Sequence, residues 1–270
     1  MKIEKPKSLS EFLELFRIYT NNGNDYYRGQ SDCSWEITPS LARNKSIRNI
    51  DILISLERKL IENFKKKIKD NNLGSLIPYV EGSYDKSWIL LMAAQHYGLP
   101  TRLLDFSNDK FTALEFAVAD IQNLNKDGAL IIYEGIESIQ ENVGSAILRS
   151  PFSQTHNTFF FQGISFGVSK NNEFNLAERR KRIQGSKFLY RDTPNLCECL
   201  SSDKLHSERL TKICIPREFK LDIIKYLMKV ERMAYDLFAG KNELDYYAAI
   251  LKLEFSKLYE SKIEEYIKSD

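Results

Sequence analysis

The sequence lacks both a long apolar run and a marked excess of charge of one sign. None of its 270 residues lie in a stretch that approaches the roughly 18 apolar residues of a membrane-spanning helix, and residues 1–6 have no apolar signal segment. Thirty-nine Lys and Arg residues balance 37 Asp and Glu residues to a formal net charge of +2. We therefore expect a cytoplasmic protein whose binding of nucleic acid, if any, depends on a local patch, with no membrane partner.

Cysteine and histidine are also scarce. The four cysteines are few for this length, and because a cytoplasmic protein keeps its thiols reduced, we expect no disulfide. A superficial set of four zinc ligands comprises Cys197, Cys199, His206 and Cys214. Its Cys-x-Cys gap is narrower than the usual two-residue gap, and its later intervals match no familiar zinc site. The sequence therefore predicts no metal site.

Apolar side chains are abundant, at 43% hydrophobic and 12% aromatic residues, which is enough for a large core. No internal repeat and no low-complexity linker divides the chain. We expect a single domain over residues 1–270, with a core at about 20–195 and a helical C-terminal extension at about 216–270.

The spacing of the apolar residues predicts the order of helices and strands. Helical periodicity covers residues 9–19, 50–70, 87–96, about 108–121 and the chain after 218. Strand-like segments cover residues 25–30, 129–133, 159–168, 187–190 and 212–216. Strands in the middle with helices at both ends indicate an α+β fold with a central, mostly antiparallel or mixed sheet.

Residues 95–105 concentrate polar groups in the expected connection between two apolar helices, which is where binding sites are commonly built. Arg102 and Asp105 are three residues apart and could pair, which would orient the guanidinium for an anionic ligand. His96 is a candidate acid, base or hydrogen-bond donor, because its pKa is ordinarily near neutral. The alternatives are a purely structural Arg–Asp bridge and a structural histidine at a helix end.

Residues 26–30 supply a second group of candidates, expected near a strand end. Arg28 offers a guanidinium, and Gly29 would let a ligand approach the backbone. Tyr26 and Tyr27 offer aromatic faces that could stack on a base or a nicotinamide ring, and Gln30 completes the segment. We expect this segment and residues 95–105 to build one functional pocket.

With both segments considered together, the chain resembles the FRG domain family, named for a Phe-Arg-Gly tripeptide that stands here as Tyr27-Arg28-Gly29. Other matching positions are Trp35, Pro39, Arg43, Glu57, Phe64, residues 95–105, residues 113–118, Arg182 and residues 184–188. Glu115 departs from the family, which more often has an aromatic or small residue there. The resemblance covers about residues 26–188. Members of the family often occur in prokaryotic defence-like settings, which implies a toxin-like effector in phage defence and an inhibitory partner protein.

Analogy with ADP-ribosyltransferases gives the first functional hypothesis, a fold and a transferase activity of that kind with NAD as the substrate. Such enzymes grip NAD with an arginine on an early strand and stabilise an oxocarbenium-like centre with a nearby polar or acidic group. The expected NAD-binding residues are Tyr26, Tyr27, Arg28, Gly29, Gln30, Arg43, Gln95, Thr101 and Arg102, with Arg102 on the pyrophosphate. The catalytic candidates are Asp105, Glu115 and Gln184 near the glycosidic bond, and His96 on the ribose hydroxyls. The acceptor would be a protein or a nucleic acid.

Two other functions remain open. A non-catalytic module that senses a nucleotide or nucleic acid would stack bases on Trp35 or the paired tyrosines. Its phosphate contacts would come from Arg28, Arg43, Arg102 and the lysines of residues 65–69. A nuclease-type hydrolase would use Glu57, His96 and Asp105 as acid, base or ligands. No recognised metal-ligand spacing supports the hydrolase.

Overall fold

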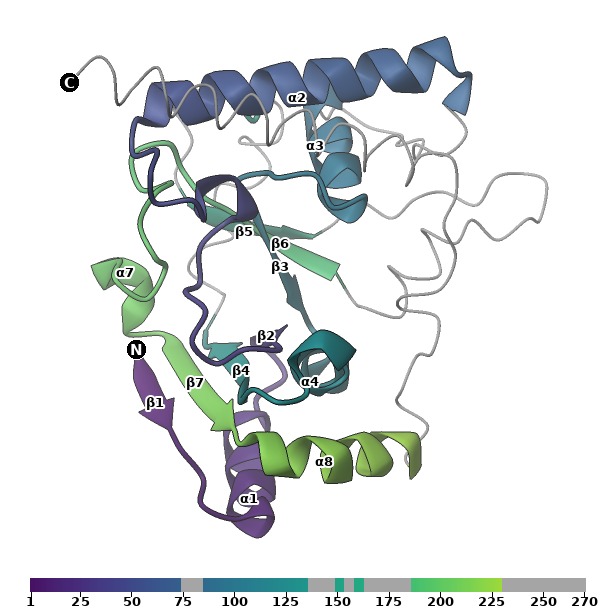
Figure 1. Cartoon of the computed structure of the whole chain (residues 1–270). Helices are drawn as coiled ribbons and strands as arrows, with labels where there is room; N and C mark the ends of the chain where they lie inside the picture. Colours follow the sequence, from purple (N-terminus) through teal and green to yellow (C-terminus); the bar gives the residue numbers. More distant parts are fainter. Residues whose placement is uncertain (74–84, 136–148, 153–157, 163–185, 230–270) are drawn as a thin grey trace.

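The computed structural model describes residues 1–73, 85–135, 149–152, 158–162 and 186–229 (Figure 1). Within these ranges the chain forms a seven-stranded sheet in the order β1-β7-β4-β2-β3-β6-β5. The strands are β1 (Lys2–Glu4), β2 (Tyr26–Gln30), β3 (Leu103–Ser107), β4 (Gly128–Tyr133), β5 (Phe159–Gln162), β6 (Ser186–Tyr190) and β7 (Leu210–Ile215). Only β1 and β7 pair in parallel among the described strands. The predicted α+β class with a mixed, mostly antiparallel sheet is confirmed.

Most predicted helices are confirmed with nearly the predicted bounds. They are α1 (Leu9–Tyr19), α2 (Ile50–Asp70), α3 (Lys86–His96), α4 (Lys110–Val118) and α8 (Arg217–Lys229), joined by the short α7 (Lys204–Ser207) and the 3-10 turns η1 (Ser40–Ala42) and η3 (Ile121–Asn123). Ser8 caps α1 by accepting a hydrogen bond from Glu11 N–H, as the sequence predicts. Asp109 caps α4 by accepting a hydrogen bond from Phe111 N–H. No helix in the described ranges combines the length and the apolar character needed to cross a bilayer.

The helices cover one face of the sheet in two groups (Figure 1). α2 and α3 pack on the β3-β6-β5 half, and α1, α4 and α8 pack on the half that contains β4 and β7. Alternate residues of the strands point to the opposite face, where Tyr26, Phe106, Tyr133, Phe160 and Leu189 share a third apolar cluster. The sheet therefore carries two separate helical layers on one side.

The two halves of the sheet are joined weakly where β2 meets β3. These strands pair only at Tyr27 and Ser107, whereas β2 pairs with β4, and β3 with β6, at five positions each. The segment 31–49 then passes from one face of the sheet to the other, since Ile37 lies in the opposite-face cluster and Leu41 lies in the core under α2. Because the strands separate beyond one pair, side chains of β2 and β3 have room to meet there.

A disulfide joins Cys33, just after β2, to Cys214 in β7. The prediction that the cysteines form no disulfide is therefore wrong for this pair. The two residues are 181 positions apart in the chain, so only the pairing of β7 with β4 brings them together. The backbone of the same segment is also held by two buried lysines, because Lys212 donates to Cys33 O and Lys220 donates to Ser31 O.

Candidate functional site

Arg28 and Asp105 meet across the separation of β2 and β3. Arg28 is the third residue of five in β2, not at a strand end as predicted, and its Nη1 donates to the backbone oxygen of Asp105 at 2.6 Å. Asp105 lies in β3, so the prediction that all of residues 95–105 form a loop is wrong. The expectation that residues 26–30 and 95–105 come together is confirmed by this contact.

A chain of hydrogen bonds fixes the Asp105 carboxylate. Gln95, near the end of α3, donates from Nε2 to Asp105 Oδ2 at 2.6 Å, and its Oε1 accepts from Thr101 Oγ1 at 2.5 Å. The backbone of Thr101 is anchored in turn, because its N–H donates to Ser40 Oγ and its carbonyl accepts from Leu41 N–H. Since Thr101 is fully buried, it positions Gln95 and does not contact a ligand, contrary to the prediction.

Three charges share the site. Asp105 is accessible to solvent, yet burial among surrounding protein raises its pKa, against the opposing influence of Arg28 and Arg43. Burial lowers the pKa of Arg28 to about 10. The nearby Asp105 opposes this shift, and Arg43 adds to it. Burial also lowers the pKa of Arg43, and Asp105 opposes that shift. An accessible carboxylate whose pKa is shifted by burial and by two nearby guanidinium groups is typical of binding sites. We call Arg28, Arg43, Gln95 and Asp105 the Asp105 site.

A cavity of about 320 Å³ adjoins this site through Arg43. Its lining residues are Gln30, Ser34, Trp35, Glu36, Thr38, Arg43 and Lys45, and we call it the Trp35 cavity. It includes the predicted Gln30 and Arg43. Sequence reasoning missed Thr38, which precedes Pro39 in the segment that crosses the sheet; the only local signal was the expectation of extended chain before that proline.

Arg102 lies away from the site, and both predictions for it are wrong. Its side chain is fully buried and pairs with Glu57 of α2, with Nε at 2.6 Å and Nη2 at 2.5 Å from Oε2, while Nη1 donates to Tyr190 Oη at 3.0 Å. Burial opposes the charge, but Glu57 and Tyr190 raise the pKa of Arg102 above its ordinary value. Arg102 cannot pair with Asp105 because residues three apart along an extended chain point to opposite sides.

The paired tyrosines are core residues. Tyr26 is 8% exposed, and its ring centroid lies 4.7 Å from that of Phe160. Both rings belong to the cluster on the face of the sheet away from the helices. Tyr27 is 4% exposed and belongs to the core beneath α1 and α4. The prediction that they stack on a ligand is wrong, because alternation along β2 sends each ring into a different apolar cluster.

Gly29 makes room for a helix and not for a ligand. A Cβ atom on Gly29 would lie 2.0 Å from Ala113 O and 2.7 Å from Ala117 N, both in the backbone of α4. Gly128 in β4 is similar, since its Cβ would lie 2.5 Å from Ala117 O. The two glycines let α4 pack directly against β2 and β4, which corrects the predicted role of Gly29.

The other catalytic candidates are dispersed. His96 is the last residue of α3, half-buried, with its ring edge-on to Tyr97 at 5.2 Å. Glu115 is buried in α4, the helix that covers the Gly29 face. Gln184 lies outside the described residues. Of the predicted catalytic residues, Asp105 is therefore the one that the described structure places against Arg28.

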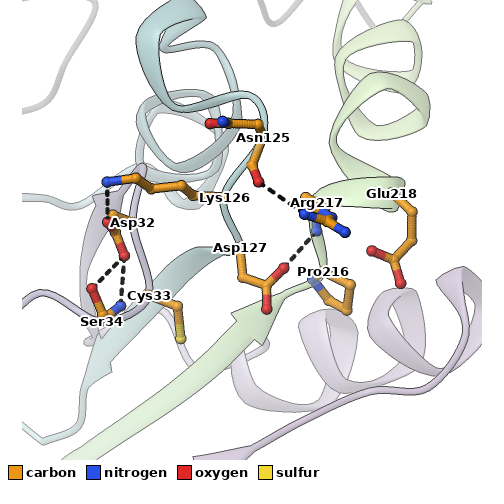
Figure 2. Close-up of a pocket in the computed structure, with 9 residues that line it drawn as sticks. All are labelled: Asp32, Cys33, Ser34, Asn125, Lys126, Asp127, Pro216, Arg217 and Glu218. Carbon is orange, nitrogen blue, oxygen red and sulfur yellow. Dashed lines mark hydrogen bonds and ion pairs between the residues drawn. The ribbon is translucent and has the colours of Figure 1, made fainter.

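A second, more open cavity of about 800 Å³ lies beside the disulfide (Figure 2). Most of its charged residues already have partners in the protein: Asp32 pairs with Lys126 at 2.7 Å, Asp127 accepts from the backbone N–H of Arg217 at 2.9 Å, and the Arg217 side chain donates to Asn125 O. Because these residues are already bonded, this cavity offers a ligand less than the Asp105 site does.

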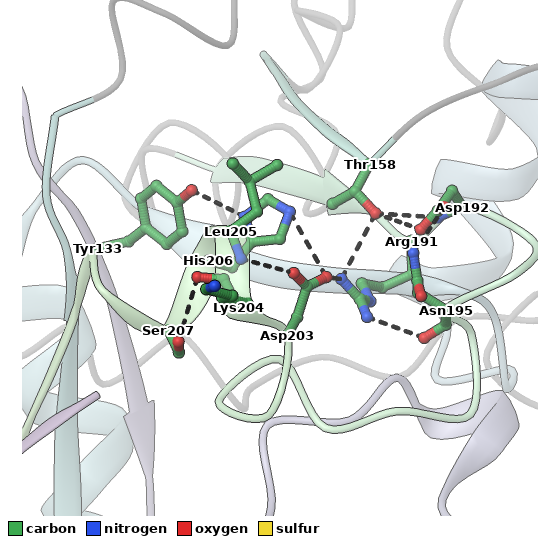
Figure 3. A network of polar contacts seen from close by, with 10 residues as sticks. All are labelled: Tyr133, Thr158, Arg191, Asp192, Asn195, Asp203, Lys204, Leu205, His206 and Ser207. Atoms are coloured by element: carbon green, nitrogen blue, oxygen red, sulfur yellow. Dashed lines mark hydrogen bonds and ion pairs between the residues drawn. The ribbon is translucent and has the colours of Figure 1, made fainter.

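A buried polar network occupies the interior near β6 and α7 (Figure 3). Tyr133 Oη lies 2.8 Å from His206 Nδ1, and Arg191 Nη1 lies 3.0 Å from Asp203 Oδ2. Burial lowers the pKa of His206, so its ring is neutral near pH 7. With His206 bonded to Tyr133 and Cys214 in the disulfide, the superficial zinc set does not assemble. No group of three metal-binding side chains occurs in the part of the chain that the structure describes.

Comparison with known proteins places the Asp105 site in a recognised domain. Residues 23–126 match the family model described as FRG domain. This span contains Arg28, Arg43, Gln95 and Asp105, and it ends before β6 and the predicted later elements at Arg182 and residues 184–188. No curated protein and no solved structure matches the chain.

Proposed function

We propose that this chain, which carries an FRG domain over residues 23–126, is an enzyme of ADP-ribosyltransferase type that uses NAD and modifies a macromolecular acceptor. One observation carries the proposal: Arg28 donates to the backbone oxygen of Asp105 at 2.6 Å beside an accessible carboxylate, and Arg43, which influences the pKa of both groups, lines a cavity next to them. Two guanidinium groups next to a carboxylate suit a substrate with a diphosphate on one side and a developing positive charge on the other.

The two arginines would bind the diphosphate. Arg28 uses only Nη1 for Asp105 O, and its buried Nε has no hydrogen-bond partner among the described residues. The planar guanidinium therefore keeps a donor edge of the kind that binds a phosphate oxygen. Arg43 is exposed and bonds only from Nε to Thr38 O in the described structure, which leaves its terminal nitrogens for a second phosphate oxygen.

Asp105 would stabilise the ribose as the glycosidic bond to nicotinamide breaks. That bond cleavage builds up positive charge on the ribose, which a fixed carboxylate stabilises electrostatically. Gln95 holds Oδ2 in place, so Asp105 needs little reorganisation when the charge develops. Arg28 and Arg43 favour the ionised carboxylate that this role requires.

The same anchors support a second candidate function, a nucleotide-binding module without chemistry. Arg28, Arg43 and the Trp35 cavity would then bind the ligand, and Asp105 would only orient it. The nuclease hypothesis has less support, because the Glu57 carboxylate that it requires is buried against Arg102. A toxin-like role in defence and an inhibitory partner protein stay predictions from the resemblance.

The decisive experiment incubates the full chain with NAD labelled in the adenylate, in the presence of a mixture of protein, DNA and RNA, and follows both label transfer and nicotinamide release. We expect both, and we expect Asp105→Asn to slow them strongly while the exposed Asp70→Asn does not. NAD binding without nicotinamide release would favour the binding module. Neither binding nor release would refute both.

A further inference from the structure

Two buried polar atoms in the wall of the Trp35 cavity lack partners within the described ranges, Gln30 Oε1 and Thr38 Oγ1. Each residue is 4% exposed. Gln30 Nε2 donates to Glu36 O at 3.2 Å, and since that carbonyl can only accept, the amide orientation is fixed with Oε1 left as an acceptor. Leaving a buried polar atom without a hydrogen-bond partner is destabilising, so a ligand group that reached either atom would gain a hydrogen bond that the protein alone does not supply.

The cavity also has a flat apolar surface. Trp35 lines it and is 44% exposed, so part of the indole is available to stack on a planar ring. Its volume of about 320 Å³ lies at the lower end of the range for small-molecule pockets, which suits one ring system and not a whole dinucleotide. Arg43 lies in the same wall and interacts with Asp105, so a ring held here is connected to the Asp105 site.

We propose that the Trp35 cavity binds the planar ring of the nucleotide substrate by an edge that carries an amino group next to an acceptor. The amino group would donate to Gln30 Oε1, the Thr38 hydroxyl would donate to the neighbouring acceptor, and Trp35 would stack on the ring. The inference rests on the proposed use of NAD. Two parts of that molecule have this edge: adenine, with its amino group beside a ring nitrogen, and nicotinamide, with its carboxamide.

Calorimetric titration of the full chain with two partial ligands tests the proposal. ADP-ribose carries adenine without nicotinamide, and nicotinamide mononucleotide carries nicotinamide without adenine. Thr38→Val removes the hydroxyl at nearly constant shape, and Trp35→Ala removes the stacking surface. Because the Thr38 hydroxyl has no partner in the described structure, Thr38→Val should not lower the melting temperature, and Ser55→Ala on the exposed side of α2 serves as a control.

We expect both cavity variants to weaken one of the two ligands by about tenfold, as the loss of one hydrogen bond or one stacking contact predicts, and to leave the other unchanged. Weaker ADP-ribose identifies adenine, and weaker nicotinamide mononucleotide identifies nicotinamide. The proposal is overturned if neither ligand binds or if both variants bind both ligands like the wild type. Ring binding without any nicotinamide release would refute the transferase alone, whereas release that Thr38→Val and Trp35→Ala leave unchanged would refute the cavity alone.

Discussion

Two arginine–carboxylate pairs in this protein differ in how completely their hydrogen-bonding groups are satisfied. Arg102 and Glu57 are sealed from solvent, and Glu57 accepts from the Arg102 side chain and from its backbone N–H. Within the described residues, the Arg28 side chain bonds to the backbone oxygen of Asp105 alone, and the Asp105 carboxylate stays accessible. The comparison teaches that Arg102 and Asp105, which belong to one sequence motif, have separate roles. Arg102 stabilises the core, whereas Asp105 remains available to a ligand.

The largest expected effect comes from breaking the sealed pair. Glu57→Gln leaves the Arg102 charge buried without a counter-charge, which should lower the free energy of unfolding by about 3–5 kcal/mol. Urea unfolding measures it, with Glu62→Gln on the exposed side of α2 as the matched control. The double variant Glu57→Leu with Arg102→Met should recover most of the loss. A loss below 1 kcal/mol in Glu57→Gln would show that the pair is not sealed.

The open pair should behave in the opposite way. Asp105→Asn should lower the rate of nicotinamide release by about 10²–10³, the effect of removing one preorganised electrostatic group, without lowering stability. Burial raises the pKa of Asp105, so ionisation costs the folded state stability that sets in as pH rises through the unfolded-state value of about 3.9. The variant should therefore match or exceed the wild type in melting temperature at pH 7 and show no gain at pH 3. A clear loss of stability at pH 7 would assign Asp105 to the core.

Gly29 tests whether the tripeptide Tyr27-Arg28-Gly29 combines a residue for core packing with a residue for ligand binding. Gly29→Ala forces a methyl group against the backbone of α4, which should destabilise the protein by about 1–3 kcal/mol or more. Gly23→Ala is the control, because a Cβ there meets nothing within 4 Å. Thermal unfolding and ADP-ribose binding are measured together. Lower affinity with unchanged stability would restore the role of Gly29 in ligand approach.

The smallest effect is a shift in pH dependence. If ionised Asp105 is required, activity falls as pH drops through its raised pKa, and Arg43→Gln should move this acid limb to higher pH because it removes a charge that lowers that pKa. No basic limb is expected from Arg28, because a guanidinium keeps its charge throughout the accessible pH range. Rates of nicotinamide release at saturating NAD across the pH range give the acid limb. An acid limb that Arg43→Gln leaves in place would separate Arg43 from Asp105.

Much of this architecture follows from local pattern. The capping residue Ser8 and the apolar spacing of residues 50–70 predict their helices, because both signals act within a few turns of chain. β3 was not predicted, because Leu103–Ser107 is short and includes the exposed Asp105. The strand that it pairs with, β6, is also distant in the sequence. The Cys33–Cys214 disulfide was not predicted for the same reason.

The sequence by itself determined most helices and strands, the α+β class and the two segments whose meeting forms the site. Only the tertiary structure decided which charges remain available there. From the sequence alone, Arg102 and Arg28 are equally plausible binding residues for an anion. In the structure, α2 places Glu57 against Arg102, while the separation of β2 and β3 leaves Arg28 beside an accessible carboxylate. Burial and pairing depend on contacts between distant segments, and these govern the free energy of each charge.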